Sequence, residues 1–420
     1  MRKDELFSYI DQRRGEILSW GQMFFDCPEL GFQEQKTADE ITRLLDEWGV
    51  PYKKGVAQTG VIATLGEGRG YHIAFAADMD ALPRGDGQGC IHACGHSIQT
   101  TIALAVMRAL LDGKVLDEAD GRVSFFFTPA EEFIDFEYRD QLIRDEKIAF
   151  RSGKQSMIAL GCFDGVDCVI SAHANGDKDT LFDIQSTLTG FVSKEAVFLG
   201  KSSHSGTAAH LGRNALHAAM LFLQAAQFLK DQYAPEVGLR LQPVITENGG
   251  SVNTIPERVV VETYVRANDT ETLLDVSTRV DELAESSSAM LGLACEVETT
   301  AGYLPLSQSK EINRIVKENM CKFCDEDDIV EGIVSGASGD AGDLSFLLPT
   351  VQFGFSGIEG QFHSDCFRVA DEENCYIRTS KVVVGTIIDL LFEPGLQVKR
   401  EGYAQRKSHY LKQLRGGKGF

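Results

Sequence analysis

Two continuous apolar runs that stop abruptly at chemically active side chains constrain the fold of this sequence most. "GRVSFFFTPAEEF" ends at Glu131 and Glu132, and "GVDCVISAHANGD" contains His173 just after its apolar part. Strands that are buried on both faces of a sheet have such unbroken apolar runs. Segments such as "SIQTTIALAVMRALLDG", with apolar residues at helical spacing, alternate with them. The sequence therefore predicts an α/β fold, with a mostly parallel sheet sandwiched by helices.

Polar residues gather where the expected strands end. Asp80 follows the apolar segment "GYHIAFAADM", and His363 follows "PTVQFGFSG". In α/β sheets, sites lie beyond the carboxyl ends of the strands, so the placement of Asp80, Glu131, Glu132 and His173 indicates one shared site. The alternatives are ordinary ones: a lone histidine is usually a core residue, and two adjacent glutamates are usually solvated acids. Because the two glutamates are adjacent, we expect their side chains to diverge, one toward a metal and the other toward a substrate.

The pattern of the chain changes near residue 186. Residues 186–303 contain alternating strands and amphipathic helices, including one predicted at Asn214–Leu229. We predict that this α+β unit is inserted between two α/β parts, residues 1–185 and 304–420. Within the first part, Gly66, Gly68 and Gly70 separate two strands. Since no helix follows these glycines, a hairpin turn is favoured over a nucleotide-binding loop.

Composition excludes several classes of function. The chain has 420 residues and a formal net charge of −21, whereas a nucleic-acid-binding protein needs a basic face. We find no apolar run near the roughly 18 residues of a membrane span, and no signal-peptide pattern at the start. Ten cysteines are scattered through the chain. We expect a cytoplasmic protein, in which disulfides are disfavoured and buried thiols or metal ligands are the remaining explanations.

The stretch "GCIHACGHSIQTT" concentrates these soft ligands. Cys94 and His96 are two residues apart, so they cannot share one helical face, and Gly95 allows a turn between them. A thiolate and an imidazole before a helix suit zinc and related divalent metals. This pair alone is a weak signal, and a buried turn without metal remains the alternative.

A set of motifs in a fixed order makes the signal specific: "AADMDALP", "IHACGHS", "TPAEE", "ISAHANGD", "GKSSHSG", "GGSVNTIPERVVVETYVR" and "FHSDCF". Together they resemble the aminoacylase/carboxypeptidase group of two-metal amidohydrolases over nearly the whole chain. "PELGFQEQKTA" resembles the branch with auxin-conjugate hydrolases, hippurate hydrolase and p-aminobenzoyl-glutamate hydrolase. The resemblance implies the metal-dependent exopeptidase fold, with the inserted unit as a lid and dimerisation domain.

The resemblance also implies a cofactor of two divalent metal ions, zinc or manganese with cobalt as a third choice. Cys94 stands where other branches use a bridging aspartate. The expected metal ligands are Cys94, His96, Glu132, His173 and His363.

Further roles follow from the same resemblance. Glu131 matches the general base, and Asp80 matches the carboxylate that orients a metal-ligating histidine. His204 matches a histidine that crosses to a partner's site in dimeric relatives and can stabilise an oxyanion. Asn253 and Arg266 match positions that face the substrate, although a salt bridge within the lid is equally compatible with Arg266. We expect a homodimer that hydrolyses an amide bond in a small N-acyl or aminobenzoyl amino acid.

The sequence also departs from this group. Ser97 stands where the group has Asp or Asn, and the bulky segment "FIDFEYRDQLIRDEKIAFRSGKQS" replaces a glycine-rich one. The bulky segment lengthens the interval from Glu132 to His173 and is expected to reshape the site. Two alternatives remain at this stage: a deformylase or lyase that uses the same metals, and a non-catalytic binding or regulatory protein. The product of the reaction distinguishes the first, and metal content the second.

Overall fold

A computed structural model describes residues 3–177 and 179–415. These residues form two compact units. The first contains the described residues up to Thr187, together with Ser307–Ser335 and Asp343–Ala404. The second contains Leu188–Leu306, Gly336–Gly342 and the described residues from Gln405 onward. Most of the second unit, Leu188–Leu306, thus interrupts the sequence of the first, whereas its last segment follows Ala404.

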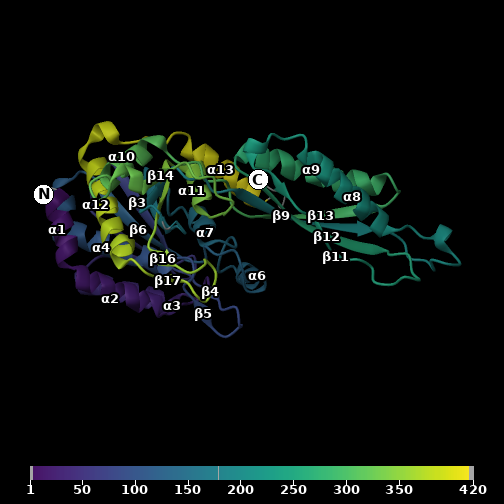
Figure 1. The fold of residues 1–420 in the computed structure, drawn as a ribbon, viewed down its shortest axis with the longest axis horizontal. Helices are drawn as coiled ribbons and strands as arrows, with labels where there is room; N and C mark the ends of the chain where they lie inside the picture. Colours follow the sequence, from purple (N-terminus) through teal and green to yellow (C-terminus); the bar gives the residue numbers. More distant parts are fainter. Residues whose placement is uncertain (1–2, 178, 416–420) are drawn as a thin grey trace. The chain divides into compact units, whose positions relative to one another are not determined.

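The first unit is built on an eight-stranded sheet (Figure 1). Its four central strands, β6, β3, β7 and β15, pair in parallel, and the strands at one edge, β1 and β2, pair antiparallel. This confirms the predicted α/β class with a mostly parallel sheet. In spatial order the strands are β1 (Tyr52–Val56), β2 (Gly60–Leu65), β6 (Arg122–Thr128), β3 (His72–Asp78), β7 (Cys168–Ala174), β15 (Thr350–Phe355), β8 (Phe182–Ile184) and β14 (Ile329–Glu331).

The predicted hairpin around Gly66–Gly70 is wrong. Strands β2 and β3 both form, but β6 lies between them and pairs with each. The glycines instead let the chain cross closely over the residues that lead into β6. A Cβ atom on Gly70 would lie only 1.6 Å from the carbonyl oxygen of Asp120, so a side chain there would clash with backbone.

Helices cover this sheet, and α4 and α12 are buried over most of their lengths. Helix α4 packs against β3, α2 and α12, and all but a few of its residues are buried. The N-terminal helical segment is divided at Arg13 into α1, which packs mainly against α12, and α2, which packs mainly against α4. The helices are α1 (Lys3–Gln12), α2 (Arg14–Phe25), α3 (Gln35–Trp48), α4 (His96–Asp112), α5 (Val115–Glu118), α6 (Phe136–Arg144), α7 (Gly153–Ala159), α10 (Lys310–Met320), α11 (Ala341–Leu347), η4 (Glu373–Arg378) and α12 (Thr379–Phe392).

Two short antiparallel ribbons complete the first unit and lead toward the candidate site. The strand β4 (Leu82–Pro83) pairs with β5 (Cys90–Ile91), four residues before Cys94. The strand β16 (Ile358–Glu359) pairs with β17 (Arg368–Val369), and His363 lies in the loop between them.

The second unit is an antiparallel sheet with two helices, α8 and α9, that pack on each other and on the strands. In β12 the residues alternate between buried and exposed over much of the strand, as expected for a sheet with one covered face. Its elements are β9 (Gly190–Leu199), α8 (Ala215–Lys230), β10 (Arg240–Leu241), β11 (Val244–Glu247), β12 (Arg258–Ala267), α9 (Thr270–Ala289) and β13 (Ala294–Ala301), and α13 (Tyr403–Arg415) follows late in the chain.

Candidate active site

The candidate site lies where three parallel strands end. Strand β3 ends at Asp78, two residues before Asp80, and β6 ends three residues before Glu131. His173 is the next-to-last residue of β7. Parallel neighbours expose their carboxyl ends at the same edge, so these side chains converge although they are far apart in sequence.

The turn between Cys94 and His96 depends on glycine. Gly95 has φ of +91°, and a Cβ atom there would lie 2.8 Å from the Cβ atom of Ala174 on β7. Only glycine satisfies both the positive φ and the close approach. Helix α4 begins at His96, so the turn presents Cys94 and His96 together at the sheet edge.

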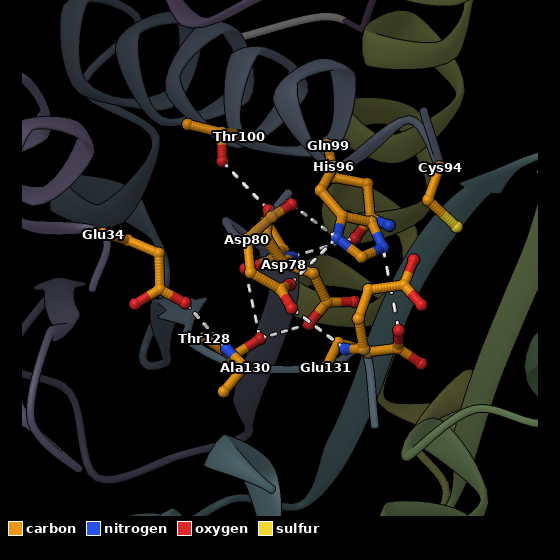
Figure 2. Close-up of polar contacts among 12 residues, drawn as sticks. Glu34, Asp78, Asp80, Cys94, His96, Gln99, Thr100, Thr128, Ala130 and Glu131 are labelled. Atoms are coloured by element: carbon orange, nitrogen blue, oxygen red, sulfur yellow. Dashed lines mark hydrogen bonds and ion pairs between the residues drawn. The ribbon is translucent and has the colours of Figure 1, made fainter. Parts of the chain in front are cut away.

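Asp80 orients the residues around it (Figure 2). His96 Nδ1 lies 3.0 Å from Asp80 Oδ1 and 3.0 Å from the Asp80 carbonyl oxygen. The other carboxylate oxygen accepts a 2.9 Å hydrogen bond from the backbone N–H of Glu132. Burial would raise the pKa of the Asp80 carboxyl, but the hydrogen bond and charge of His96 and the hydrogen bond from the Glu132 N–H together lower that pKa. A charged Asp80 thus fixes the imidazole so that Nε2 points into the cluster.

The candidate ligands approach one another closely. Cys94 Sγ lies 3.7 Å from His173 Nε2, and His363 Nε2 lies 3.4 Å from Glu132 Oε1. The Nδ1 atom of His173 is 2.8 Å from the Ala174 carbonyl oxygen, which leaves Nε2 to face Cys94. The donor atoms form three overlapping groups, each within 4.8 Å: Cys94, His96 and His173; Cys94, Glu132 and His363; and His96, Glu131 and Glu132.

The residues present fit a metal centre. His96 Nε2 and Glu132 Oε1 are buried and have no hydrogen-bond partner among the described residues, which is costly unless a cation binds them. Burial and the nearby Glu132 raise the pKa of the Cys94 thiol well above its ordinary value. A thiol ligates metal as the thiolate, so a divalent cation would compensate this cost. Sulfur, imidazole and carboxylate donors are the set that zinc accepts.

The two adjacent glutamates are not solvated acids. Glu131 is 9% exposed and Glu132 is 7% exposed. The predicted divergence of their side chains is wrong in one respect, because each offers an oxygen to the group that contains His96. Glu131 Oε2 lies 3.8 Å from His96 Nε2. Both carboxylates therefore face the cluster.

Three further residues that the sequence singled out lie in the second unit. His204 is exposed, and its Nδ1 accepts hydrogen bonds from the backbone N–H groups of Gly206 at 3.1 Å and Thr207 at 3.2 Å, which leaves Nε2 as the other ring nitrogen available to a ligand. The neighbouring segment contains Asn253, whose carbonyl oxygen accepts a 2.9 Å bond from the Ser205 N–H.

Arg266 lies on β12 of the same unit. Its Nη1 is 3.3 Å from both the Gly336 carbonyl oxygen and the Ser338 hydroxyl, and its guanidinium lies 5.4 Å from the Phe191 ring centre. In the part of the chain that the structure describes, Arg266 forms no ion pair. The alternative of a salt bridge within the lid therefore has no support.

The sequence did not reveal the residues that fix Asp78, which ends β3 two residues before Asp80. Asp78 and Lys154 form a buried ion pair. Burial would raise the pKa of the Asp78 carboxyl, but Lys154, His96 and Thr128 together lower it. Gln99 accepts from the Asp78 N–H at 3.0 Å, and Thr100 donates to the Asp78 carbonyl oxygen at 3.1 Å. Gln99 and Thr100 interrupt the apolar start of α4, which is a usable signal. Lys154 gives none, because a lysine in a charged segment is normally exposed.

His92, which lies between Cys90 and Cys94 in the sequence, does not belong to any of the three donor groups. Its ring is 2% exposed, and burial lowers its pKa to about 4. It is therefore a neutral core histidine beside the site.

Comparison with known proteins agrees with this site. Residues 74–388 match the model of "Peptidase family M20/M25/M40". The chain belongs to this family. The predictions of the family, of the α/β fold class and of a hydrolase are thereby confirmed.

Individual relatives cover nearly all of the chain. An N-acetyl-L-cysteine deacetylase of Bacillus subtilis (strain 168) is 28% identical over 372 residues, which cover 84% of this chain and 83% of the relative. The structure of an aminohydrolase from methicillin-resistant Staphylococcus aureus has a TM-score of 0.81 at 22% identity, covering 93% of this chain and 100% of that one. A dinuclear metal-binding peptidase of the M20 family from Bacillus subtilis has a TM-score of 0.70 at 21% identity, covering 91% of this chain and 99% of that one. None of the described helices has the length and apolar character of a membrane span.

Proposed function

We propose that this protein hydrolyses the amide bond of a small N-acyl or aminobenzoyl amino acid. One observation supports this most: Asp80 fixes His96 so that its Nε2 lies within the donor cluster, 3.8 Å from the carboxylate of Glu131. A metal ligand and a proton acceptor are thus neighbours in a buried site, as amide hydrolysis by activated water requires. The B. subtilis relative is named for removing an acetyl group from an amino acid, which supports the substrate class.

The donor groups support a centre for two metal ions. Cys94 belongs to two of the groups, once with His96 and His173 and once with Glu132 and His363. Cys94, His96, Glu132, His173 and His363 would hold these ions, and Cys94 would be close to both groups of donors. Zinc, manganese and cobalt all accept this mixture of sulfur, nitrogen and oxygen donors.

Within this site, each residue has a task. When bound, the metal ions supply Lewis-acid polarisation of the substrate carbonyl and lower the pKa of water. Glu131 accepts the proton of the attacking water at its carboxylate and returns it to the leaving amine. We assign His204 to stabilise the oxyanion through its Nε2, and Asn253 to bind the substrate. Arg266, a half-buried guanidinium, would pair with the substrate carboxylate.

The second unit is assigned as the lid and dimerisation domain, with His204 serving the partner's site in a homodimer. Its helix α8 exposes apolar side chains: Met220 is 49% exposed and Phe228 is 67% exposed. Exposed apolar groups of this size on one helix favour a covered interface. The net charge of −21 and the ten cysteines, all free, support a cytoplasmic location.

A substrate panel tests the proposal. The purified protein, loaded with zinc or manganese, is incubated with N-acetyl, N-benzoyl and aminobenzoyl amino acids, and the released free amine is quantified. We expect release from at least one class, and loss of release in Glu131→Gln. Absence of any free amine from metal-loaded protein across the panel would refute amide hydrolysis of this substrate class.

A further inference from the structure

The backbone that carries the two glutamates is strained. Ala130, which immediately precedes Glu131, has φ of +53°, a left-handed conformation that non-glycine residues rarely adopt. Such a conformation persists only where surrounding contacts enforce it, and it is common at active sites. The structure must therefore contain groups that hold the segment from Pro129 to Glu132 in place.

Two buried side chains hold this segment by its backbone. Glu34 Oε1 accepts a 2.8 Å hydrogen bond from the N–H of Ala130, and Figure 2 shows the Glu34 carboxylate directed toward it. Arg139 of α6 donates from Nη2 to the carbonyl oxygen of Glu132. One contact thus acts before Glu131 and the other after Glu132, so together they bracket the pair.

Arg139 lies in an unusual environment for a cation. It is 1% exposed, and among the described residues its Nε has no hydrogen-bond partner and no carboxylate forms an ion pair with it. Its other contacts are the Arg151 carbonyl oxygen at 2.7 Å from Nη1, and the face of Phe32, whose centre is 5.5 Å from the guanidinium carbon. Burying a charge without an opposite charge is costly. If this position only had to fill space, an apolar side chain would be more stable than arginine.

Gly31 leaves the space that Arg139 occupies. A Cβ atom on Gly31 would lie 2.7 Å from Arg139 Nη2 and 2.8 Å from the Cα atom of Ala130. Around this contact Phe32, Ala130, Leu142 and Ile148 form a small apolar cluster of their own. The bulky segment that follows Glu132 therefore packs against Ala130 through Leu142 and Ile148. Its Arg139 donates a hydrogen bond to the Glu132 carbonyl oxygen.

We propose that Arg139 is a positioning residue for the Glu131–Glu132 pair. Its guanidinium fixes the Glu132 carbonyl, while Glu34 fixes the Ala130 N–H, so that both carboxylates stay directed at the cluster. The effect on turnover rests on the proposed function, whereas the effect on metal binding does not. Removing Arg139 loosens Glu132 as a metal ligand and Glu131 as a proton acceptor, without touching substrate.

The test compares variants of the whole protein in two readouts: zinc affinity, by competition with a chromogenic chelator, and kcat and KM on the best panel substrate. In Arg139→Met we expect zinc affinity to fall about 10-fold, as for other groups that support a ligand. We expect kcat to fall about 10–100-fold with KM within about 3-fold, because misplaced reacting groups slow the reaction more than they weaken binding. Arg139→Lys restores one donor and should recover part of both losses.

Leu142→Ala is the matched control, since Leu142 lies on the same helix and in the same apolar cluster. It should lower Tm comparably and leave affinity and kcat within about 3-fold, because the contact to the Glu132 carbonyl remains. If Arg139→Met fails to fold, Arg139→Leu provides the same test, because it also removes the guanidinium that contacts the Glu132 carbonyl oxygen and keeps an apolar side chain in the cluster.

Two outcomes decide the matter. If Arg139→Met, or Arg139→Leu in its place, loses no more zinc affinity than Leu142→Ala, Arg139 is a packing residue and the inference is overturned. If the wild-type protein binds zinc but releases no amine from any substrate, the proposed function fails. The zinc-affinity comparison then still decides the role of Arg139.

Discussion

Asp80→Asn should weaken metal binding whichever way the new amide is oriented. With its oxygen toward His96 Nδ1, the amide NH2 replaces the oxygen that accepts the Glu132 N–H at 2.9 Å, so two donors face each other. With the NH2 toward His96, it either meets the Nδ1 proton that the Asp80 carbonyl oxygen can still accept, or the imidazole moves that proton to Nε2, the atom that faces the cluster. A hydrogen bond to a buried charged group contributes about 1.5–3 kcal/mol, and an unsatisfied buried donor costs about 1–3 kcal/mol. Loss of one such bond therefore predicts a destabilisation of about 1.5–3 kcal/mol.

The expected fall in zinc affinity is about 10–100-fold, as for other groups that orient a ligating histidine. The assay is competition with a chromogenic chelator on apo protein, alongside thermal unfolding with and without zinc. Asp389→Asn is the control, because Asp389 is also a buried carboxylate, accepting from Asn319 at 2.8 Å and pairing with Lys3 on the far helices. It should lower Tm without changing zinc affinity. Unchanged affinity in Asp80→Asn, within about 3-fold, would show that Asp80 does not orient His96.

Three other predictions follow from the same structure. Glu131→Gln should keep zinc affinity and lose about 10²–10⁴-fold in turnover, since a carboxamide cannot accept the proton of water; more than a third of wild-type turnover would exclude Glu131 as the base. Burial raises the pKa of Glu34 from 4.5 to about 8, so its contribution to stability is present at pH 5 and is lost as the pH rises through 8. The Tm of Glu34→Gln relative to wild type should therefore rise between pH 5 and 9, and parallel curves would contradict this. Mixing inactive His204→Ala with inactive Glu131→Gln chains should restore up to about a quarter of wild-type activity if His204 serves the partner's site; no recovery despite subunit exchange would place His204 elsewhere.

The sequence by itself determined the class of fold and the ligand candidates. Unbroken apolar runs require strands with two buried faces, and the residues just after such runs must lie at one sheet edge. For this reason Asp80, Glu131 and His173 were found as neighbours without any structure, and the local turn at Gly95 explains why Cys94 joins them.

Only the tertiary structure decided what holds these residues in place. The contact of Glu34 with Ala130 joins residues 96 positions apart, and Lys154 meets Asp78 across 76 positions. Neither has a periodic or motif signal, because a buried charge looks like a surface charge in the sequence until its partner is known. The hairpin prediction failed because it also depended on a contact between segments that are distant in the sequence. Strand order depends on which distant strand, here β6, inserts between two neighbours, and no local pattern encodes that choice.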